Sequence, residues 1–576
     1  MRSGGGPVSD VRSTEPPADP GGGVGRRPQL PEPSRAPEDL WKPPPAQLRK
    51  SGEPGARLAE IRPAPPAQVP AATLWSALAA ALLSTLLLGD GLGLNLLIVT
   101  VPVALAAYFA ARPAGRRPRA WTLVWAVGGT ALLGVPALRD AGWPTFLAVL
   151  GALFAGSLAL HGGRTWPGVL LGSIGILDSL ATGMAWGWRG VRERAGSSRT
   201  RWGTAVRTTA VAAVLLIVFG ALFAGADAAF ADLLGGLIPD ISIADGPWRL
   251  FLFGLGLVGT LAAAHTAAAP LRWDRLAVRP GRARARWEWA PPLIVLDLLF
   301  AAFIAVQLAV LFGGYDKVLR ETGLTHAEYA RQGFWQLLWA TVLTLLVIGL
   351  ALRWAPRGTA GDRALVRTVL GTLCLLTLVV VASALRRMDL YVDAYGLTRL
   401  RTSVAAMELW LGLVILLIMA AGVFGVKWLP RAVAASAAGA VLVFGVLSPD
   451  GMVAERNVER YQRTGKIDVG YFQELSADAV PALDRLPEPL RSCALAGIAK
   501  NLADEDKPWY ATSWGESRAR RILADRKADT FGYACADDGV SGERDEYDGF
   551  GEFDDPGQDG EIRPYDSGNQ GPYEMP

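Results

Sequence analysis

The chain has 576 residues, of which 51% are hydrophobic and 19% are charged, and its 57 basic residues stand against 53 acidic ones. The apolar residues are concentrated between positions 72 and 448, which excludes a single soluble globular core. The small charge excess excludes a strongly basic surface for nucleic acid, and three cysteines are too few for a disulfide-rich scaffold or a zinc ribbon.

Residues 1–71 are rich in proline and glycine and contain no long apolar run. Such a segment buries too little apolar surface to offset the entropy lost on ordering, so we expect a disordered cytoplasmic leader. Proline clusters at 43–45 and 63–66 leave two interpretations open. The leader is either a flexible tail or a segment that binds a protein partner as polyproline.

Residues 72–448 contain apolar runs of about 17–25 residues, the length that an α-helix needs to cross a bilayer. Each run is expected to be helical, because backbone polar groups in lipid need partners within their own segment. The sequence therefore predicts an all-α, polytopic transmembrane bundle of about eleven spans in the lipid bilayer of the cell membrane. The expected spans are 72–89, 91–111, 120–138, 142–161, 204–224, 248–269, 291–312, 334–352, 368–385, 404–426 and 432–448.

The basic residues between the spans predict the orientation. One set of alternating connections carries 23 Lys and Arg, and the other set carries 8. The positive-inside rule places the richer set and the N-terminus in the cytoplasm, and eleven spans then place the C-terminus outside the cell. Residues 165–188 are long enough for a further span, but Asp178 and the arginines that follow favour an interfacial or re-entrant helix.

The segment after the last span is expected to divide in two. Residues 449–535 predict a small extracytoplasmic helical domain, because Ser513 and Glu516 form a capping-box pattern and apolar residues between 490 and 502 recur at helical spacing. Residues 536–576 are strongly acidic and predict a disordered tail.

Cys493 and Cys535 both lie in the segment that is expected outside the cell, where a disulfide can persist. A bridge between them would contribute about 3–4 kcal/mol by constraining the unfolded chain. Two unrelated thiols are the alternative, because the sequence does not show whether the two residues are close.

Polar residues inside spans are the main functional candidates, because their burial in lipid is costly. His265 and Asp297 lie at similar depths in neighbouring spans, which suggests either a proton-relaying pair or a structural buried pair. Gln307 shares the span of Asp297. Glu408 lies near the outer end of its span, where a salt bridge with a nearby arginine is the simpler interpretation.

A GxGxxG pattern occurs at 254–259, inside an expected span. A dinucleotide site would need this pattern between a strand and a helix. The position therefore predicts close helix packing through small residues.

The outer connections combine acids, tyrosines and arginines, which line either a ligand cleft or an interfacial belt. The candidate residues are Tyr329, Arg331, Asp393, Tyr395, Arg401, Asn457 and Asp478.

Three stretches carry a family resemblance: YDKVLRETGLTHAEYARQGFWQL (315–337), YVDAYGLTRLR (391–401) and NVERYQRTGKIDVGYFQELSADAVPAL (457–483). They are similar to signature stretches of a bacterial membrane family, domain of unknown function 4173, which is related to family 4153. The resemblance covers roughly residues 200–485. It implies an integral membrane protein with no assigned activity, and it supplies no catalytic or ligand-binding residues.

The sequence predicts no catalytic, cofactor-binding or metal-binding residues, since it has neither a Walker A motif nor HExxH and its three histidines are scattered. A transporter or permease and a membrane sensor or regulatory scaffold are favoured about equally. An intramembrane enzyme acting on lipid or cell-wall precursors ranks last, because no acid–base constellation stands out. A scaffold would engage an unidentified protein at the leader or the outer domain, and the substrate stays open.

Overall fold

The computed structural model describes residues 61–63, 66, 68–197, 246–276, 284–313, 334–355, 358–504 and 507–528, with scattered positions between 208 and 227. The predicted leader up to residue 60, most of the predicted span at 204–224 and the predicted acidic tail lie outside these residues. Every regular element in the described part of the chain is a helix, as predicted. All of these elements belong to one compact unit, residues 57–576.

The helices of the described part fall before or after residue 448. Before it lie α2 (Ala71–Leu87), α3 (Asn95–Ala111), α4 (Ala120–Leu133), α5 (Val135–Leu138), α6 (Gly142–His161), α7 (Trp166–Ile174), η2 (Gly175–Asp178), α8 (Ser179–Ser197), α11 (Gly246–Ala268), η4 (Trp273–Arg275), α12 (Arg286–Gly313), α15 (Phe334–Trp354), α16 (Ala360–Tyr395), α17 (Arg399–Phe424) and α18 (Leu429–Leu447). After it lie α19 (Pro449–Thr464), α20 (Val469–Phe472), η5 (Ala477–Ala479), α21 (Val480–Leu483), α22 (Leu490–Asp504) and α23 (Trp514–Asp525).

Nine helical segments among the described residues are long and apolar enough to cross a membrane, and the shorter apolar helices α2 and α3 precede them. The chain is therefore a multi-pass integral membrane protein, which confirms the predicted class. Ten of the eleven expected spans coincide with a described helix. The number of spans stays a prediction, because the nine segments include Trp166–Arg194, which was expected not to cross.

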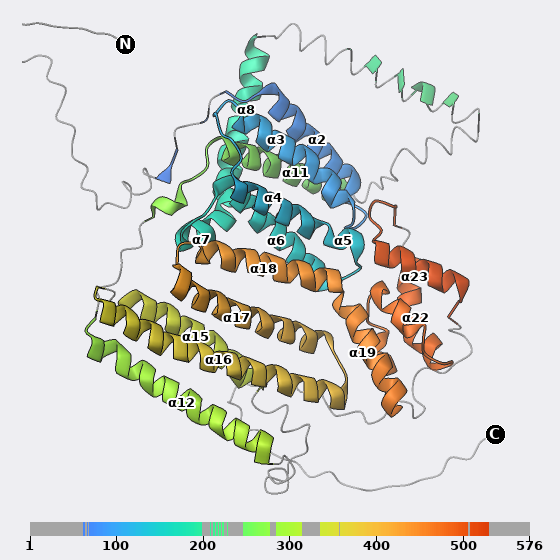
Figure 1. Cartoon of the computed structure of the whole chain (residues 1–576). Helices are drawn as coiled ribbons and strands as arrows, with labels where there is room; N and C mark the ends of the chain where they lie inside the picture. The colour runs from blue at the N-terminus through green and yellow to red at the C-terminus, as the bar shows by residue number, and fades with distance from the viewer. Residues whose placement is uncertain are drawn as a thin grey trace, which may run out of the picture. The chain divides into compact units, whose positions relative to one another are not determined.

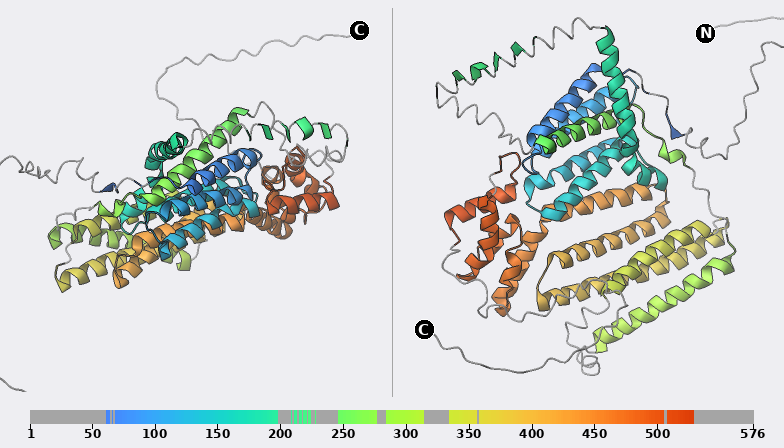
Figure 2. Two further views of the ribbon diagram at one scale, coloured as in Figure 1. Left: turned by 90° about the horizontal axis from the view of Figure 1, so that it is seen from above. Right: turned by 180° about the vertical axis from the view of Figure 1, so that it is seen from behind.

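The membrane helices lie side by side in a continuous row (Figures 1 and 2). At one end of the row α11 packs against α2, α3 and α8, and in the middle α18 packs against α4 and α6. At the other end α16 packs against α12, α15 and α17. Contacts of α6 with α11 and of α17 with α18 join these three sets.

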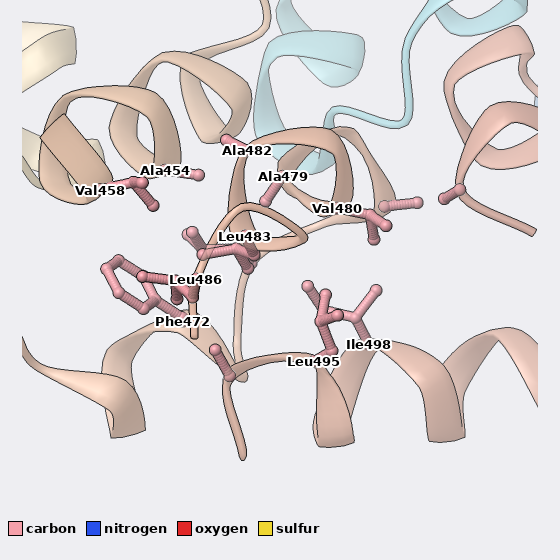
Figure 3. Close-up of a cluster of buried hydrophobic side chains, with 14 of the residues drawn as sticks. Ala454, Val458, Phe472, Ala479, Val480, Ala482, Leu483, Leu486, Leu495 and Ile498 are labelled. Atoms are coloured by element: carbon pink, nitrogen blue, oxygen red, sulfur yellow. The ribbon is translucent and has the colours of Figure 1, made fainter. Parts of the chain in front are cut away.

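The residues after 448 form a C-terminal helical group, residues 449–528, with a hydrophobic core of its own. Phe472, Leu483, Leu495 and Ile498 are at most 2% exposed and face one another in this core (Figure 3). The expected apolar face of α22 contributes Ile498 and its helical neighbours to the core. Helix α23 begins directly after Ser513, whose hydroxyl accepts a hydrogen bond from the backbone N–H of Glu516, as the capping pattern predicted.

The C-terminal helical group marks one end of the membrane bundle, which we call the near end, on the right of Figure 1. The opposite end is the far end. Near-end connections are 88–94, 139–141, 396–398 and 448, and far-end connections are 112–119, 162–165, 269–276 and 425–428.

Residues 166–194 begin and end at the far end of the bundle. Just before their start, the backbone N–H of Thr165 donates to Asp274 at 2.9 Å, and at their end Arg194 donates to the carbonyl oxygen of Val69, which precedes α2. Midway, Gly183 packs so closely on α11 that a Cβ would lie 2.8 Å from the carbonyl oxygen of Leu261. Both ends of the segment therefore lie at the far end, as expected of an interfacial or re-entrant segment, and whether the segment crosses the membrane stays a prediction.

Helices α11 and α2 approach closely at Gly256. A Cβ at this position would lie 2.5 Å from the Ser84 hydroxyl and 3.1 Å from the Cα of Ala81, whereas Gly254 and Gly259 have nothing within 4 Å of such an atom. Close packing through the GxGxxG pattern therefore depends on its middle glycine.

The packed part of the chain begins earlier than the predicted boundary of the leader at residue 71. Ile61 is 3% exposed and Val69 is 2% exposed. The carbonyl oxygen of Ile61 accepts a hydrogen bond from the backbone N–H of Arg272 at 3.0 Å. Two apolar residues in a proline-rich segment are too few to produce a recognisable apolar run in the sequence.

Candidate functional site

The five predicted outer-face residues that the structure describes gather where the C-terminal helical group meets the near end of the bundle. Helix α17 starts at Arg399, and α19 starts after Ser448 with Asp450 in its first turn. Arg399 donates to the two carboxylate oxygens of Asp450 from Nε at 2.7 Å and from Nη2 at 2.6 Å. The backbone N–H of Ser476 donates to the same carboxylate at 2.8 Å. A bidentate, charge-assisted pair of this kind fixes the two helix starts against each other.

Asn457 joins α19 to the turn between α16 and α17. Its side-chain oxygen accepts from the backbone N–H of Leu397 at 2.9 Å, and its amide donates to the carbonyl oxygen of Leu397 at 2.8 Å. Gly396 has a φ of 85°, and a Cβ there would lie 2.6 Å from the Asn457 side-chain oxygen. The stretches 391–401 and 457–483 are therefore in direct contact, and their glycine is required by both conformation and space.

Arg401 and Tyr395 lie on the surface of this junction. The Arg401 guanidinium lies 4.1 Å from the ring centroid of Tyr391, within the range of a cation–π interaction, and donates to the carbonyl oxygen of Gly396. Tyr395 is 44% exposed and lies beside Tyr391, with ring centroids 5.1 Å apart. Asp393 is exposed, and its backbone carbonyl oxygen accepts from Arg460 at 3.3 Å. The structure thus places these residues together with Asn457.

Asp478 and Asp140 form a second part of the junction. The Ser448 hydroxyl donates to Oδ2 of Asp478 at 2.7 Å, and Arg139 lies 3.9 Å from Oδ1. The backbone N–H of Ala477 donates to Asp140 at 3.1 Å. Burial raises the pKa of Asp478 and the pKa of Asp140 above their usual values, because removal from water disfavours the charged form.

A third part of the junction joins the C-terminal helical group to the first helices of the bundle. The Tyr510 hydroxyl donates to Asp90 at 3.1 Å, and the Tyr510 carbonyl oxygen accepts from the backbone N–H of Asn95 at 3.0 Å. The other oxygen of Asp90 pairs with Arg249 of α11 at 3.2 Å, and the Arg249 side chain is 6% exposed. The C-terminal helical group therefore contacts residues from all three sets of membrane helices.

The residues that the sequence did not single out here are Asp90, Asp140, Asp450 and Tyr510. Ser448-Pro449-Asp450 is a helix-start pattern, with a capping serine and an acid in the first turn, so Asp450 had a recognisable signal. Asp90 and Asp140 are the acids of very short connections, whose polarity alone does not indicate a partner. Tyr510 has no local sequence signal.

The predicted His265–Asp297 pair is not formed. His265 lies in α11 with its ring centroid 5.8 Å from that of Trp186 in α8, whereas Asp297 lies in α12, which packs against α16. Figure 1 shows α11 and α12 near opposite ends of the row of helices. Neighbouring spans in sequence were assumed to be neighbours in space, and the long connection between α11 and α12 makes that assumption wrong.

Gln307 and Glu408 each bond a hydroxyl on a neighbouring helix. Ser383 of α16 donates to the Gln307 side chain, and Thr341 of α15 donates to Oε1 of Glu408 at 3.2 Å. Glu408 is fully buried and forms no ion pair among the described residues. The expected salt bridge with a nearby arginine is therefore not present there, because Arg399 pairs with Asp450 instead.

Three of the candidate residues, Tyr329, Arg331 and Cys535, lie outside the described part of the chain. Cys493 is disulfide-bonded, while Cys374 is a free, buried thiol. The pairing of Cys493 with Cys535 stays a prediction. Within the described ranges, no group of three or more His, Cys, Asp or Glu residues is arranged to hold a metal ion.

A cavity of about 650 Å³ lies at the far end of the bundle. It lies between the end of the leader, the ends of α3, α6 and α11, and the connections that follow them. Its wall includes Arg116, Arg119, His161, Trp186, Arg272 and Trp273.

The row of apolar helices with its attached C-terminal helical group defines an all-helical, multi-pass integral membrane protein. The sequence profile of the family described as Domain of unknown function (DUF4153) matches residues 127–486, and the chain belongs to this family. The match confirms the resemblance and extends it toward the N-terminus, from about residue 200 to residue 127. No curated protein and no solved structure matches the chain at a significant level.

Proposed function

We propose that this protein is a membrane sensor in which the C-terminal helical group, outside the cell, is coupled to the cytoplasmic ends of the membrane helices. The observation that carries the proposal is the position of three helices, α3, α6 and α11. Each of these helices has its near end at the junction with the C-terminal helical group and its far end at the cavity.

The helices α3, α6 and α11 make polar contacts at the near end and line the cavity at the far end. Asn95 starts α3 and bonds Tyr510, Asp140 precedes α6 and bonds Ala477, and Arg249 of α11 pairs with the aspartate that Tyr510 contacts. At the far end, α3, α6 and α11 contribute Ala110, His161 and Ala268 to the cavity wall. A shift of the C-terminal helical group would displace the same helices that shape the cavity.

The distribution of charge supports the orientation in this proposal. The far-end connections contain most of the basic residues between the membrane helices, among them Arg112, Arg116, Arg117 and Arg119 in one connection. By the positive-inside rule, the far end is cytoplasmic and the C-terminal helical group is outside. A protein partner of the sensor would bind the leader or the C-terminal helical group.

Hydrogen exchange of the full chain in nanodiscs tests the coupling. In the double variant Asp140→Ala with Tyr510→Phe, we expect amide exchange in the last turns of α3, α6 and α11 to rise on the order of tenfold. Arg456→Ala is the matched control, because Arg456 forms only an exposed pair with Glu459 on the same helical group. If the faster exchange stays at the near end, coupling to the cavity is contradicted.

A transporter is the second candidate, because Glu408 is a fully buried carboxylate inside a membrane helix. Proton flux into proteoliposomes, followed with a pH-sensitive dye, tests this candidate. Glu408→Gln should abolish a flux that the unchanged chain supports, and Glu408-independent flux or none at all would contradict it. The intramembrane enzyme considered from the sequence stays a prediction.

A further inference from the structure

We propose that the far-end cavity binds a phosphate group, carried either by a lipid headgroup or by a soluble phosphorylated molecule. Unbalanced positive charge in the wall, two buried ring nitrogens without partners and the position of the cavity support this assignment. It goes beyond the proposed function, because binding in the cavity does not require coupling to the C-terminal helical group.

The wall of the cavity has an excess of positive charge, with four arginines and a single aspartate. Among the described residues, Arg116, Arg119 and Arg272 form no ion pair. Arg116 is oriented by a hydrogen bond from its Nη1 to the carbonyl oxygen of Ala267 at 3.0 Å. Its pKa is lowered by burial and by the charges of Arg119 and Arg272, as expected for cations gathered without a counter-ion.

The aspartate of the wall, Asp274, has another structural task. Its Oδ1 accepts from the backbone N–H groups of Arg164 at 2.8 Å and Thr165 at 2.9 Å, and from the Thr165 hydroxyl at 3.0 Å. This oxygen therefore holds the turn that starts α7. The guanidinium groups of Arg116, Arg119 and Arg272 remain available to an anion that enters from outside.

Two buried ring nitrogens in the wall residues have no hydrogen-bond partner in the described part of the chain: Nε2 of His161 and Nε1 of Trp273. His161 is 9% exposed, and its Nδ1 bonds the carbonyl oxygen of Ser157 at 3.0 Å. A Cβ on Gly175 would lie 2.8 Å from each of the two ring nitrogens, so both nitrogens lie beside this glycine. Buried polar atoms of native proteins nearly always have partners. A phosphate oxygen can accept from the Trp273 N–H, and a protonated phosphate oxygen can donate to Nε2 of a neutral His161.

The size and place of the cavity fit a phosphate that carries an organic group. A volume of about 650 Å³ falls in the range of small-molecule sites and exceeds the needs of a bare ion. Ala110, Trp186 and Ala268 supply an apolar part of the wall next to the arginines. Because the cavity lies at the ends of membrane helices, it is at the depth where lipid headgroups occur.

Thermal unfolding of the full chain in a neutral detergent tests the proposal with four probes. Inorganic phosphate and glycerol 3-phosphate represent soluble ligands, dioctanoyl phosphatidic acid represents a lipid headgroup, and dioctanoylglycerol is the lipid without phosphate. We expect at least one phosphate-bearing probe to raise the Tm by about 2 °C or more, through binding to the folded state alone. A response to soluble probes identifies a soluble ligand, and a response to the phosphatidic acid alone identifies a headgroup.

Arginine substitutions locate the binding. Arg116→Gln with Arg272→Gln should raise the probe concentration at half-maximal shift by about tenfold or more, since two charge-assisted contacts are lost. Arg353→Gln with Arg367→Gln is the matched control, because it removes the same charge at the far end outside the cavity. An equal loss in the control pair, no shift with any phosphate probe, or an equal shift with dioctanoylglycerol would overturn the proposal.

If the glutamine pair does not fold, Trp273→Phe decides. It removes one N–H group from the wall without changing the charge, and we expect about a threefold or greater rise in the half-maximal probe concentration. A half-maximal concentration that stays unchanged in a folded Trp273→Phe protein would overturn the proposal.

Discussion

The carboxylates at the near end differ in how they are satisfied. Asp450 accepts three hydrogen bonds, two of them from the Arg399 guanidinium. Asp478 has one bonded oxygen, whereas its Oδ1 is buried without a hydrogen-bond partner among the described residues. Burial of this unbonded oxygen opposes the charged form of Asp478. The attachment through Arg399 and Asp450 therefore depends on charge, whereas the attachment through Asp478 is weakened when Asp478 is charged.

The Arg399–Asp450 pair depends on the shape of the guanidinium group. In Arg399→Lys the charge is kept but the two parallel bonds are lost, so we expect the C-terminal helical group to be destabilised by about 2 kcal/mol. Proteolysis of residues 449–528 at increasing denaturant concentrations measures this loss of stability. Arg386→Lys is the control, because its pair with Asp389 is exposed, and an equal loss there would contradict the prediction.

The stability of the junction should depend on pH through Asp478 and Asp140. Their folded pKa values lie above the usual value of 3.8, so the folded state binds protons more readily than the unfolded state. Their contribution is therefore greatest below the unfolded pKa and is lost as the pH rises through the folded pKa. The denaturant concentration at the midpoint of unfolding should therefore fall as the pH rises from 4 to 8. The slope of this fall should be smaller in the double variant Asp478→Asn with Asp140→Asn. An unchanged slope in that variant would refute the assignment.

The sequence indicated only part of the junction. Asn457, Arg401 and Asp478 were predicted as outer-face candidates, and all three lie in it. The roles of Asp90 and Tyr510 could not be predicted, because the two residues bond each other and lie 420 residues apart in the sequence. His265 and Asp297 show the opposite error, since burial in two consecutive spans does not determine which helices are neighbours.

Among the helices, the contact of α11 with α2 allows a clean comparison of two glycines. Gly256→Ala places a methyl group against Ser84 and Ala81, so we expect a loss of about 1–3 kcal/mol from overpacking. Gly259→Ala has open space around its Cβ, so it should be neutral or stabilising by up to about 1 kcal/mol through helix propensity. The Tm values of the two purified variants test this, and similar values would refute the packing argument.

If residues 166–194 form an interfacial or re-entrant segment, both of its ends lie on one side of the membrane. Cysteines replacing Arg164 and Arg192, each in a chain with Cys374 replaced by Ala, should react with an impermeant maleimide from the same side. Both positions are exposed in the structure. Labelling from opposite sides would show that residues 166–194 cross the membrane.

Element types were predictable because each membrane helix is specified by local composition. The apolar runs gave the helices, and the Ser513 pattern gave the start of α23. The path of residues 166–194 required tertiary contacts, because its length and hydropathy equal those of a spanning helix. The burial of Ile61 and Val69 could likewise not be predicted from the sequence, since it depends on a surface formed by distant helices.

For the molecule as a whole, the orientation of the two ends is the central prediction. A cysteine replacing Arg117, at the far end, should react only from the cytoplasmic side, and a cysteine replacing Trp509, which is 72% exposed, should react only from outside. Labelling of intact cells against permeabilised cells measures both. Reaction of both positions from one side would refute the proposed arrangement.

The attachment of residues 449–528 to all three sets of helices also sets an order of events during synthesis. Asp90 and Asn95 emerge from the ribosome early, but their partner Tyr510 is made only after every membrane helix described here. The contacts of connection 88–94 are therefore complete only after the last helices of the chain have been made. A chain that stops before Lys507 would retain its apolar helices and lack this closure, so we expect such chains to insert normally and then to be degraded faster than the full chain.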